Sequence, residues 1–308
     1  MNITEDRKFS LSEMQSWTLD QKIDHSLGVI DQYLSRLDGK AYVSFSGGKD
    51  STVLLDLCRL VKPDILAVFC NTGNEFPDIV KAVRATENVK IIYPKMKPVE
   101  VIAKYGFPLI SKETSGMLHG IRVNPNSLTS MYQLGIKPRP EGCKFTGKLA
   151  NKWRYLIDEP FDISNKCCAK LKKEPFKRYE KESGLNPIIG VMASESSMRK
   201  ATAEKTPCNV FSEKKNISRP LQIWTEKDIY EYIARRGIKL PDIYKYTNRT
   251  GCMFCGYGAQ MKGDNRFSVL RKLYPKWYYR FMSLKNNGVT YGEALERVGV
   301  DLKQGELF

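Results

Sequence analysis

Short apolar runs alternate with amphipathic stretches along most of this sequence. Residues 41–45, 65–70, 89–93 and 187–192 have strand character, and residues 52–60 carry apolar side chains at helical spacing. Strands that alternate with helices of about ten residues are typical of a parallel sheet. We therefore predict an α/β fold, with a doubly wound, mostly parallel sheet and helices on both of its faces.

The same pattern predicts several elements around this sheet. Residues 15–38 are predicted to form an amphipathic helix that Thr18 caps and Gly39 ends. Residues 125–140 contain several prolines and are predicted to be a loop, whereas residues 146–182 are predicted to be helical and basic.

A glycine-containing run follows the first predicted strand. Its residues are Ser46, Gly47, Gly48, Lys49, Asp50 and Ser51. The glycines let the backbone approach an anion closely, and the first turn of the next helix presents unpaired N–H groups to it. The spacing differs from that of a Walker A loop. We predict a phosphate site in which Asp50 either caps the helix or binds Mg²⁺.

Other candidate site residues follow from the predicted topology. Ligands of doubly wound sheets bind beyond the carboxyl ends of the strands. The nucleotide-binding candidates at those ends are Thr72, Gly73, Glu195 and Arg199. Lys112 is a candidate contact for a phosphate or sulfate, with an ordinary surface lysine as the alternative.

The chain has eight cysteines, and in a reducing compartment, where we expect this protein, they indicate metal binding or catalysis rather than disulfides. Cys252 and Cys255 form a C-x-x-C pair, and Cys167 and Cys168 are adjacent. Four thiolates suit either a zinc ion or an iron–sulfur cluster. We favour the cluster, because adjacent cysteines fit poorly around one zinc ion but are able to bind different irons.

These motifs together resemble the phosphoadenosine phosphosulfate reductase family of the PP-loop, or N-type ATP pyrophosphatase, superfamily. The Cys-Cys pair, its basic run and the distant C-x-x-C resemble the [4Fe-4S] site of adenylyl-sulfate reductases and of DNA-phosphorothioation sulfurtransferases. The resemblance covers about residues 42–256. It implies an adenine nucleotide alpha hydrolase-like fold and a cluster held by Cys167, Cys168, Cys252 and Cys255.

The chain departs from the family pattern at two places. Reductases of this family carry a mobile C-terminal cysteine, whereas the last cysteine here is Cys255. The segment before Glu195 reads Gly190-Val191-Met192, where Gly-x-Arg is usual. Cys143 and Cys208 are the remaining candidate nucleophiles, and we expect structural or neutral roles for both.

We divide the chain into three parts on this basis. Residues 1–40 form an N-terminal helical segment, residues 41–235 the nucleotide-binding domain, and residues 236–308 a basic helical region with the C-x-x-C pair. No apolar run reaches the length of a membrane span, and residues 1–20 lack the apolar segment of a signal peptide. We expect a cytoplasmic protein without a membrane partner.

Three functional hypotheses stay open. In the first, which we favour, the enzyme binds ATP and Mg²⁺, adenylates a substrate and transfers sulfur to it, with Lys49, Asp50 and Lys112 as catalytic residues. In the second, it reduces adenylyl sulfate (APS) or its 3′-phosphorylated form (PAPS) with a thiol from elsewhere. In the third, it binds nucleic acid without catalysis.

The charge of the chain bears on its partners. The formal net charge is +16, which favours polyanions such as DNA or RNA, although a merely basic surface is the alternative. Residues 245–285 hold nine basic residues and one acid among aromatic residues that either stack on bases or form a helical core. The residues expected to contact nucleic acid are Lys262, Arg266, Arg271 and Arg280. A sulfur-donor or thiol-carrying protein is a further expected partner, and the oligomeric state is open.

Overall fold

The structure is a computed structural model, and it describes residues 9–142, 147–213, 215–248 and 250–302. The chain forms two compact units whose segments alternate along the sequence. The first unit comprises Met1–Asn71, Pro77–Tyr93 and Phe176–Tyr244, and the second comprises Thr72–Phe76, Pro94–Pro175 and Lys245–Phe308. Within the described residues, no helix combines the length and apolar character that crossing a membrane requires.

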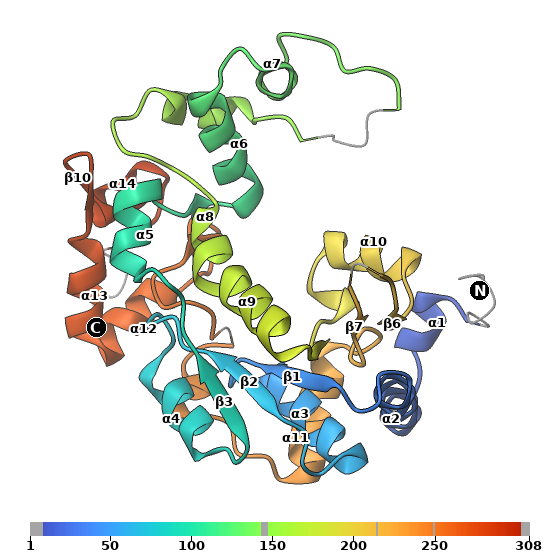
Figure 1. Cartoon of the computed structure of the whole chain (residues 1–308). Helices are drawn as coiled ribbons and strands as arrows, with labels where there is room; N and C mark the ends of the chain where they lie inside the picture. The colour runs from blue at the N-terminus through green and yellow to red at the C-terminus, as the bar shows by residue number, and fades with distance from the viewer. Residues whose placement is uncertain (1–8, 143–146, 214, 249, 303–308) are drawn as a thin grey trace. The chain divides into compact units, whose positions relative to one another are not determined.

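The first unit contains a six-stranded sheet in the order β3-β2-β1-β5-β7-β6 (Figure 1). The strands are β1 Ala41–Phe45, β2 Ala67–Cys70, β3 Val89–Ile92, β5 Asn186–Ile189, β6 Asn209–Val210 and β7 Ile217–Ser218. Every neighbouring pair is parallel except β6 and β7, which are antiparallel. The predicted mostly parallel sheet is therefore confirmed.

Helices cover both faces of this sheet. They are α1 Leu11–Gln15, α2 Leu19–Arg36, α3 Lys49–Val61, α4 Pro77–Ala85, α9 Glu174–Ser183, α10 Ser197–Lys205 and α11 Glu226–Arg236, with short 3₁₀ turns η3 Ala193–Glu195 and η4 Asp242–Lys245. In Figure 1, α3, α4 and α11 lie on one side of the strands and α9 lies on the other. Tyr42 of β1 packs its ring against Phe176 and Tyr179 of α9.

The position of β1 creates a topological switch point. Val43 pairs with Ala67 of β2 on one side and with Ile188 of β5 on the other. The chain leaves β1 toward β2, so no crossover connection fills the space beyond the carboxyl ends of β1 and β5. Ligands of doubly wound sheets bind at such a point.

The predicted helix over residues 15–38 is confirmed in its main part. Thr18 and Gln21 form the predicted capping box, and Gly39 adopts a φ of 70° just beyond the helix. The prediction was wrong at its start, because Gln15 ends α1 and α2 begins at Leu19. The extended backbone of Thr18, which its capping role requires, separates the two helices.

The second unit is mostly helical. Its elements are α5 Pro98–Tyr105, β4 Leu109–Ile110, α6 Lys112–Val123, α7 Leu128–Leu134, η1 Asn151–Ile157, α8 Lys166–Cys168, η2 Ala169–Lys173, β8 Gly256–Tyr257, α12 Arg266–Leu273, α13 Pro275–Met282, β9 Lys285–Asn286, β10 Val289–Thr290 and α14 Tyr291–Arg297. The strands β4 and β8 are parallel, and β9 and β10 form a hairpin. Its aromatic core includes Phe107, Phe161, Phe254, Phe281 and Tyr291.

Two expectations for this unit were wrong in part. Residues 125–140 are not only a loop, because they contain α7, which Ser127 caps and Gly135 ends with a φ of 73°. The prolines flank this helix and do not interrupt it. Residues 146–182 are not continuously helical, because residues 158–165 connect η1 to α8 without helical structure.

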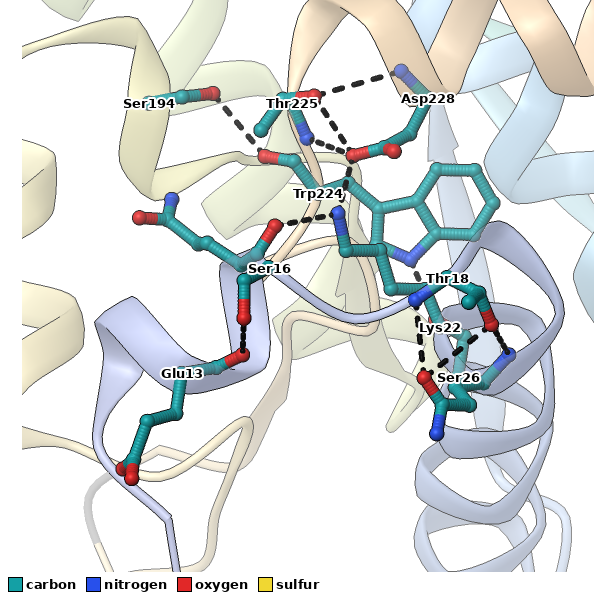
Figure 2. Close-up of polar contacts among 11 residues, drawn as sticks. Glu13, Ser16, Thr18, Lys22, Ser26, Ser194, Trp224, Thr225 and Asp228 are labelled. Carbon is teal, nitrogen blue, oxygen red and sulfur yellow. Dashed lines mark hydrogen bonds and ion pairs between the residues drawn. The ribbon is translucent and has the colours of Figure 1, made fainter.

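A buried ion pair joins α2 to α11 in the first unit. Lys22 Nζ lies 2.7 Å from Asp228 Oδ2, and the two side chains are 2% and 11% exposed (Figure 2). Asp228 also accepts a hydrogen bond from the Thr225 N–H at 2.7 Å. Trp224 Nε1 donates to Ser26 Oγ on α2 at 2.9 Å. These contacts fix the start of α11 against α2.

We expect Asp228→Asn to lower the free energy of unfolding by about 3–5 kcal/mol, because Lys22 would stay charged, buried and unpaired. Asp20→Asn is the matched control, since Asp20 pairs with Arg235 at the surface, and it should cost less than about 1 kcal/mol. Urea unfolding followed by tryptophan fluorescence measures both values. Equal losses for the two variants would contradict the importance of the buried pair.

Candidate functional site

The run from Ser46 to Ser51 connects β1 to α3 in the first unit. Gly47 has a φ of 69°, and a Cβ there would lie 2.7 and 2.9 Å from methyl carbons of two α4 side chains. The hydroxyl of Ser51 accepts a hydrogen bond from the Ser46 N–H at 3.1 Å and donates to the Gly48 carbonyl at 2.9 Å. Glycine is therefore required at position 47, and the loop holds its own conformation through its serines.

No side chain of the N-cap residue accepts a hydrogen bond from the first turn of α3. Gly48 is its N-cap and supplies no side-chain hydrogen bond. The Lys49 N–H instead donates to the hydroxyl of Tyr244 at 2.7 Å. First-turn amides and the helix dipole together attract anions. The Tyr244 oxygen thus takes the acceptor position at the Lys49 N–H, where an anion bound at this helix end would compete with it.

We expect Tyr244→Phe to bind pyrophosphate and ATP more tightly, by about fivefold, because a net hydrogen bond of about 1 kcal/mol no longer competes for the Lys49 N–H. Tyr230→Phe is the control, because the Tyr230 ring lies 5.8 Å from Lys49 Nζ and would be kept. Isothermal titration calorimetry measures both affinities. Weaker binding by Tyr244→Phe would mean that the hydroxyl contacts the bound nucleotide itself.

Carboxylates surround the buried Lys49 of this loop. Its Nζ lies 3.4 Å from Asp50 Oδ1 and 3.3 Å from Glu226 Oε1. Burial opposes the charge of Lys49, but these carboxylates raise its pKa. Asp50 Oδ1 is buried and accepts no hydrogen bond among the described residues, so its contact with Lys49 is an ion pair without hydrogen-bond geometry.

The charge balance at Asp50 is unfavourable. Burial raises the pKa of the Asp50 carboxyl, Lys49 lowers it, and the charges of Glu195 and Glu226 raise it further. Two cations, Lys49 and the Arg199 that pairs with Glu195, thus face three carboxylates. This arrangement leaves negative charge beside the phosphate loop, and an additional cation would stabilise it.

Glu195 follows β5 at the same end of the sheet. The hydroxyl of Ser194 donates to the Trp224 carbonyl at 3.1 Å (Figure 2), which ties this segment to the start of α11. Glu195 accepts a hydrogen bond from the Met192 N–H at 2.9 Å and pairs with Arg199. The first unit therefore brings Glu195 and Arg199 to the switch point with the loop, and their nucleotide-binding role stays a prediction.

Three other predicted site residues belong to the second unit. The N–H and hydroxyl of Thr72 donate to the Glu75 carboxylate at 2.9 and 2.8 Å, and Gly73 has a φ of 78° in the same turn. Lys112 is exposed at the start of α6, and its charge acts on Cys168. The nucleotide contacts predicted for these residues stay predictions.

The C-x-x-C segment is held by backbone and side-chain hydrogen bonds within the second unit. The Met253 N–H donates to the Asn74 carbonyl at 2.8 Å, and the Tyr291 hydroxyl donates to the Phe254 carbonyl at 2.6 Å. Arg266 Nη1 donates to the carbonyls of Cys255 and Tyr257 at 2.8 and 2.9 Å. The conformation of Cys252 and Cys255 is therefore fixed by residues far away in sequence.

Cys167 and Cys168 lie at the end of α8, directly before the π-helical turn η2. Cys167 Sγ lies 3.8 Å from the Tyr257 hydroxyl. The hydrogen bond between the two adjacent thiols lowers the pKa of Cys168 to about 6 and raises that of Cys167. Burial raises the pKa of Cys252 to about 11 and also raises that of Cys255.

The four predicted thiols are neighbours. The charge of Cys255 acts on Cys167, and that of Cys168 acts on both Cys252 and Cys255. Lys172 stands among them, because the charge of Cys252 raises its pKa most and Glu75 and Cys168 raise it further. Across the part of the chain that the structure describes, no three His, Cys, Asp or Glu side chains are arranged to hold a single metal ion.

A comparison with family models identifies the chain. Residues 40–108 and 132–257 match the model of the phosphoadenosine phosphosulfate reductase domain. The chain belongs to the phosphoadenosine phosphosulfate reductase family. The matched segments contain the phosphate loop and the four predicted cluster ligands Cys167, Cys168, Cys252 and Cys255.

Individual proteins similar to this family member are distant from it. It is 25% identical to the uncharacterized protein MJ0973 of Methanocaldococcus jannaschii over 88% of this chain and 54% of that protein. The chain spans about half the length of the curated relatives that it matches. Among solved structures, a phosphate complex of phosphoadenylyl-sulfate reductase from Candida auris is 19% identical with a TM-score of 0.42, covering 77% of this chain and 96% of that one. The tRNA thiolase NcsA of Methanococcus maripaludis with its [4Fe-4S] cluster is 14% identical with a TM-score of 0.39, covering 94% and 82%.

The other cysteines of this family member have different surroundings. Cys58 and Cys70 are buried, and burial raises the pKa of the Cys58 thiol. Cys208 is half-buried. Cys143 lies outside the described residues. No disulfide joins any of the described cysteines.

The predicted nucleic-acid contacts are only partly suited to that role. Arg266 pairs with Asp264 and holds the C-x-x-C segment, and its predicted contact with nucleic acid stays a prediction. Lys262 and Arg280 are exposed, and Arg280 lies 5.5 Å from the centre of the Trp277 ring. Phe267 and Leu270 are buried, so these two residues belong to the core, which was the alternative to stacking on bases.

Proposed function

We propose that this family member is an iron–sulfur-dependent ATP pyrophosphatase that adenylates a substrate and transfers sulfur to it. We choose ATP over a sulfonucleotide because carboxylates surround the phosphate loop. One of their oxygens, Asp50 Oδ1, is buried without a hydrogen bond among the described residues. A sulfonucleotide alone would add anionic charge beside three carboxylates. ATP arrives with Mg²⁺, which supplies the missing positive charge.

Asp50 and Glu195 are the residues that we propose to hold Mg²⁺. The orphaned oxygen of Asp50 and the proximity of Glu195 fit the ion. Mg²⁺ usually binds to one or two carboxylates together with substrate phosphates and water, so a cage of three protein ligands is not required. When bound, the ion would offset the charge of the phosphates.

The loop residues then have defined tasks. The first-turn amides of α3 would bind the β- and γ-phosphates, and Lys49 would offset the charge that develops on them. An oxygen of the substrate attacks the α-phosphorus, the bond to the bridging oxygen breaks, and pyrophosphate leaves. A sulfur nucleophile then attacks the substrate carbon that bears the adenylated oxygen. The bond between this carbon and the oxygen breaks, and AMP leaves with the oxygen.

We further propose that Cys167, Cys168, Cys252 and Cys255 hold a [4Fe-4S] cluster. The donor set fits, because the four thiols are neighbours and the positive charge of Lys172 acts on Cys168, Cys252 and Cys255. Each thiolate of such a cluster binds a different iron, so the thiols need not converge on one ion. When bound, the cluster would supply an electrostatic or redox-active centre, because four thiolates leave none of its irons open to bind sulfur directly.

Nucleic acid is the substrate class that we propose. The net charge of +16 favours a polyanion, and exposed cations such as Lys262 and Arg280 accompany the exposed ring of Tyr279. Small sulfonucleotides would need far fewer positive charges.

Product analysis under anaerobic conditions tests this proposal. The protein is incubated with ATP, Mg²⁺ and either RNA or DNA, and in parallel with adenylyl sulfate and an external thiol. We expect pyrophosphate from the first mixture and no sulfite from the second. Sulfite release without pyrophosphate would identify a sulfonucleotide reductase instead.

A further inference from the structure

A second cysteine environment with catalytic character lies in the first unit, apart from the four proposed cluster ligands. Cys208 Sγ lies 3.7 Å from Nε2 of His25 on α2, and both side chains are half-buried. The ring of Trp17 packs edge-on against the His25 ring with 5.7 Å between centroids. The imidazole is therefore held beside a thiol that solvent reaches, which is the arrangement of a nucleophile and its base.

Arg219 adds positive charge next to this pair. Its backbone N–H donates to the Cys208 carbonyl at 2.8 Å, and its guanidinium interacts electrostatically with the Cys208 thiol. Arg219 Nη1 is buried and has no hydrogen-bond partner among the described residues. A buried N–H donor of a cation is costly to leave unsatisfied, so this atom indicates an anionic group that the site is built to receive.

The topology places Cys208 at the end of the sheet where the parallel strands have their carboxyl ends, which is also the end where the phosphate loop lies. Asn209, the first residue of β6, pairs with Ser218, the last residue of β7, and the two strands are antiparallel. Since β7 runs parallel to β5 and β5 to β1, the residue before β6 lies at the carboxyl ends of these strands. Three strand spacings of about 4.8 Å put it roughly 14 Å from β1 across the sheet.

We propose that Cys208 is a sulfur-accepting nucleophile that takes the terminal sulfur atom from a low-molecular-weight or protein persulfide. His25 Nε2 removes the thiol proton, and the Cys208 thiolate attacks the outer sulfur of the donor. A new S–S bond forms at Cys208, the S–S bond of the donor breaks, and the departing thiolate takes the proton back from the imidazolium. The products are a Cys208 persulfide and the donor thiol, and no oxidant or reductant is consumed.

The charges around Cys208 agree with this step. Burial lowers the pKa of His25, so the imidazole is neutral near pH 7 and is free to accept a proton. Arg219 favours the thiolate and the anionic persulfide through its charge. The inference rests on the proposed function only for the later use of this sulfur, because its acceptance at Cys208 needs neither ATP nor the cluster.

Thiol reactivity and persulfide formation test the proposal directly. The intact protein is labelled with iodoacetamide between pH 6 and pH 9.5, and the labelling rate of Cys208 is followed by peptide mass spectrometry. His25→Asn is compared with His119→Asn, which alters the other, similarly half-buried histidine of the chain. The unlabelled proteins are then incubated with glutathione persulfide and analysed for an added sulfur atom on Cys208.

We expect iodoacetamide to label Cys208 several-fold faster near pH 7 in the wild type and in His119→Asn than in His25→Asn. Persulfide should form on Cys208 in the wild type and several-fold more slowly in His25→Asn. An unchanged labelling rate of Cys208 in His25→Asn, or no sulfur on Cys208, overturns the inference. Pyrophosphate release that persists in that case would keep the proposed function, whereas a reactive Cys208 without pyrophosphate release would remove the proposed function alone.

Discussion

Asp50→Asn is expected to lower Mg²⁺-dependent pyrophosphate release from ATP by about 10²- to 10³-fold, a loss typical of removing one preorganised electrostatic contact from an active site. The amide keeps the size of the side chain but removes the negative charge that we propose for Mg²⁺. Initial rates of pyrophosphate release measure the loss. Asp56→Asn alters the other acid of α3, whose carboxylate accepts hydrogen bonds from Tyr232 and Arg236, and it should leave the rate unchanged.

The stability of the Asp50→Asn variant separates this effect from misfolding. The folded-state pKa of Asp50 is raised, so its ionised form is disfavoured by folding. This carboxyl therefore reduces stability as the pH rises through its folded pKa, and at pH 7 its ionised form destabilises the metal-free protein. Asp50→Asn should be at least as stable as the wild type without Mg²⁺. A variant that has lost stability along with activity would contradict the role that we give to Asp50.

Cys252→Ser is expected to lose the iron–sulfur cluster, with iron falling from about four atoms per chain toward none. A serine hydroxyl is a poor ligand for iron at neutral pH, and the loss of one of four thiolates exposes the cluster to solvent. Anaerobic iron and acid-labile sulfide analysis, together with the visible absorption spectrum, measures the outcome.

Cys58→Ala is the matched control for the cluster, because Cys58 is buried in α3 of the first unit. It should keep its iron. A wild-type protein with one zinc ion and no iron would overturn the cluster, and so would a Cys252→Ser variant that keeps a full complement of iron.

The parts of the fold that depend on local pattern could be predicted from the sequence. The strand from Ala41 to Phe45, the glycine at position 47 and the Thr18 cap each depend on residues within a few positions, so periodicity and turn chemistry identify them. The sheet is mostly parallel, as predicted, because alternating strands and helices allow few arrangements of the strands.

The contacts that complete the sites could not be predicted in this way. The hydroxyl of Tyr244 meets the Lys49 N–H across 195 positions of sequence, and Cys208 meets His25 across 183. No local spacing distinguishes such residues from ordinary core or surface residues. The ion pair of Arg266 with Asp264 and its hydrogen bond to the Cys255 carbonyl likewise could not be predicted from its position in a basic segment.

The most direct test of the central claim is the affinity of the wild-type protein for ATP and for adenylyl sulfate, each measured by calorimetry with and without Mg²⁺. The carboxylates around Lys49 predict that Mg²⁺ strengthens ATP binding by about tenfold or more, which corresponds to about 1.4 kcal/mol. Adenylyl sulfate should bind weakly and without response to Mg²⁺. Tight, Mg²⁺-independent binding of adenylyl sulfate, together with ATP binding that Mg²⁺ does not alter, would contradict the account.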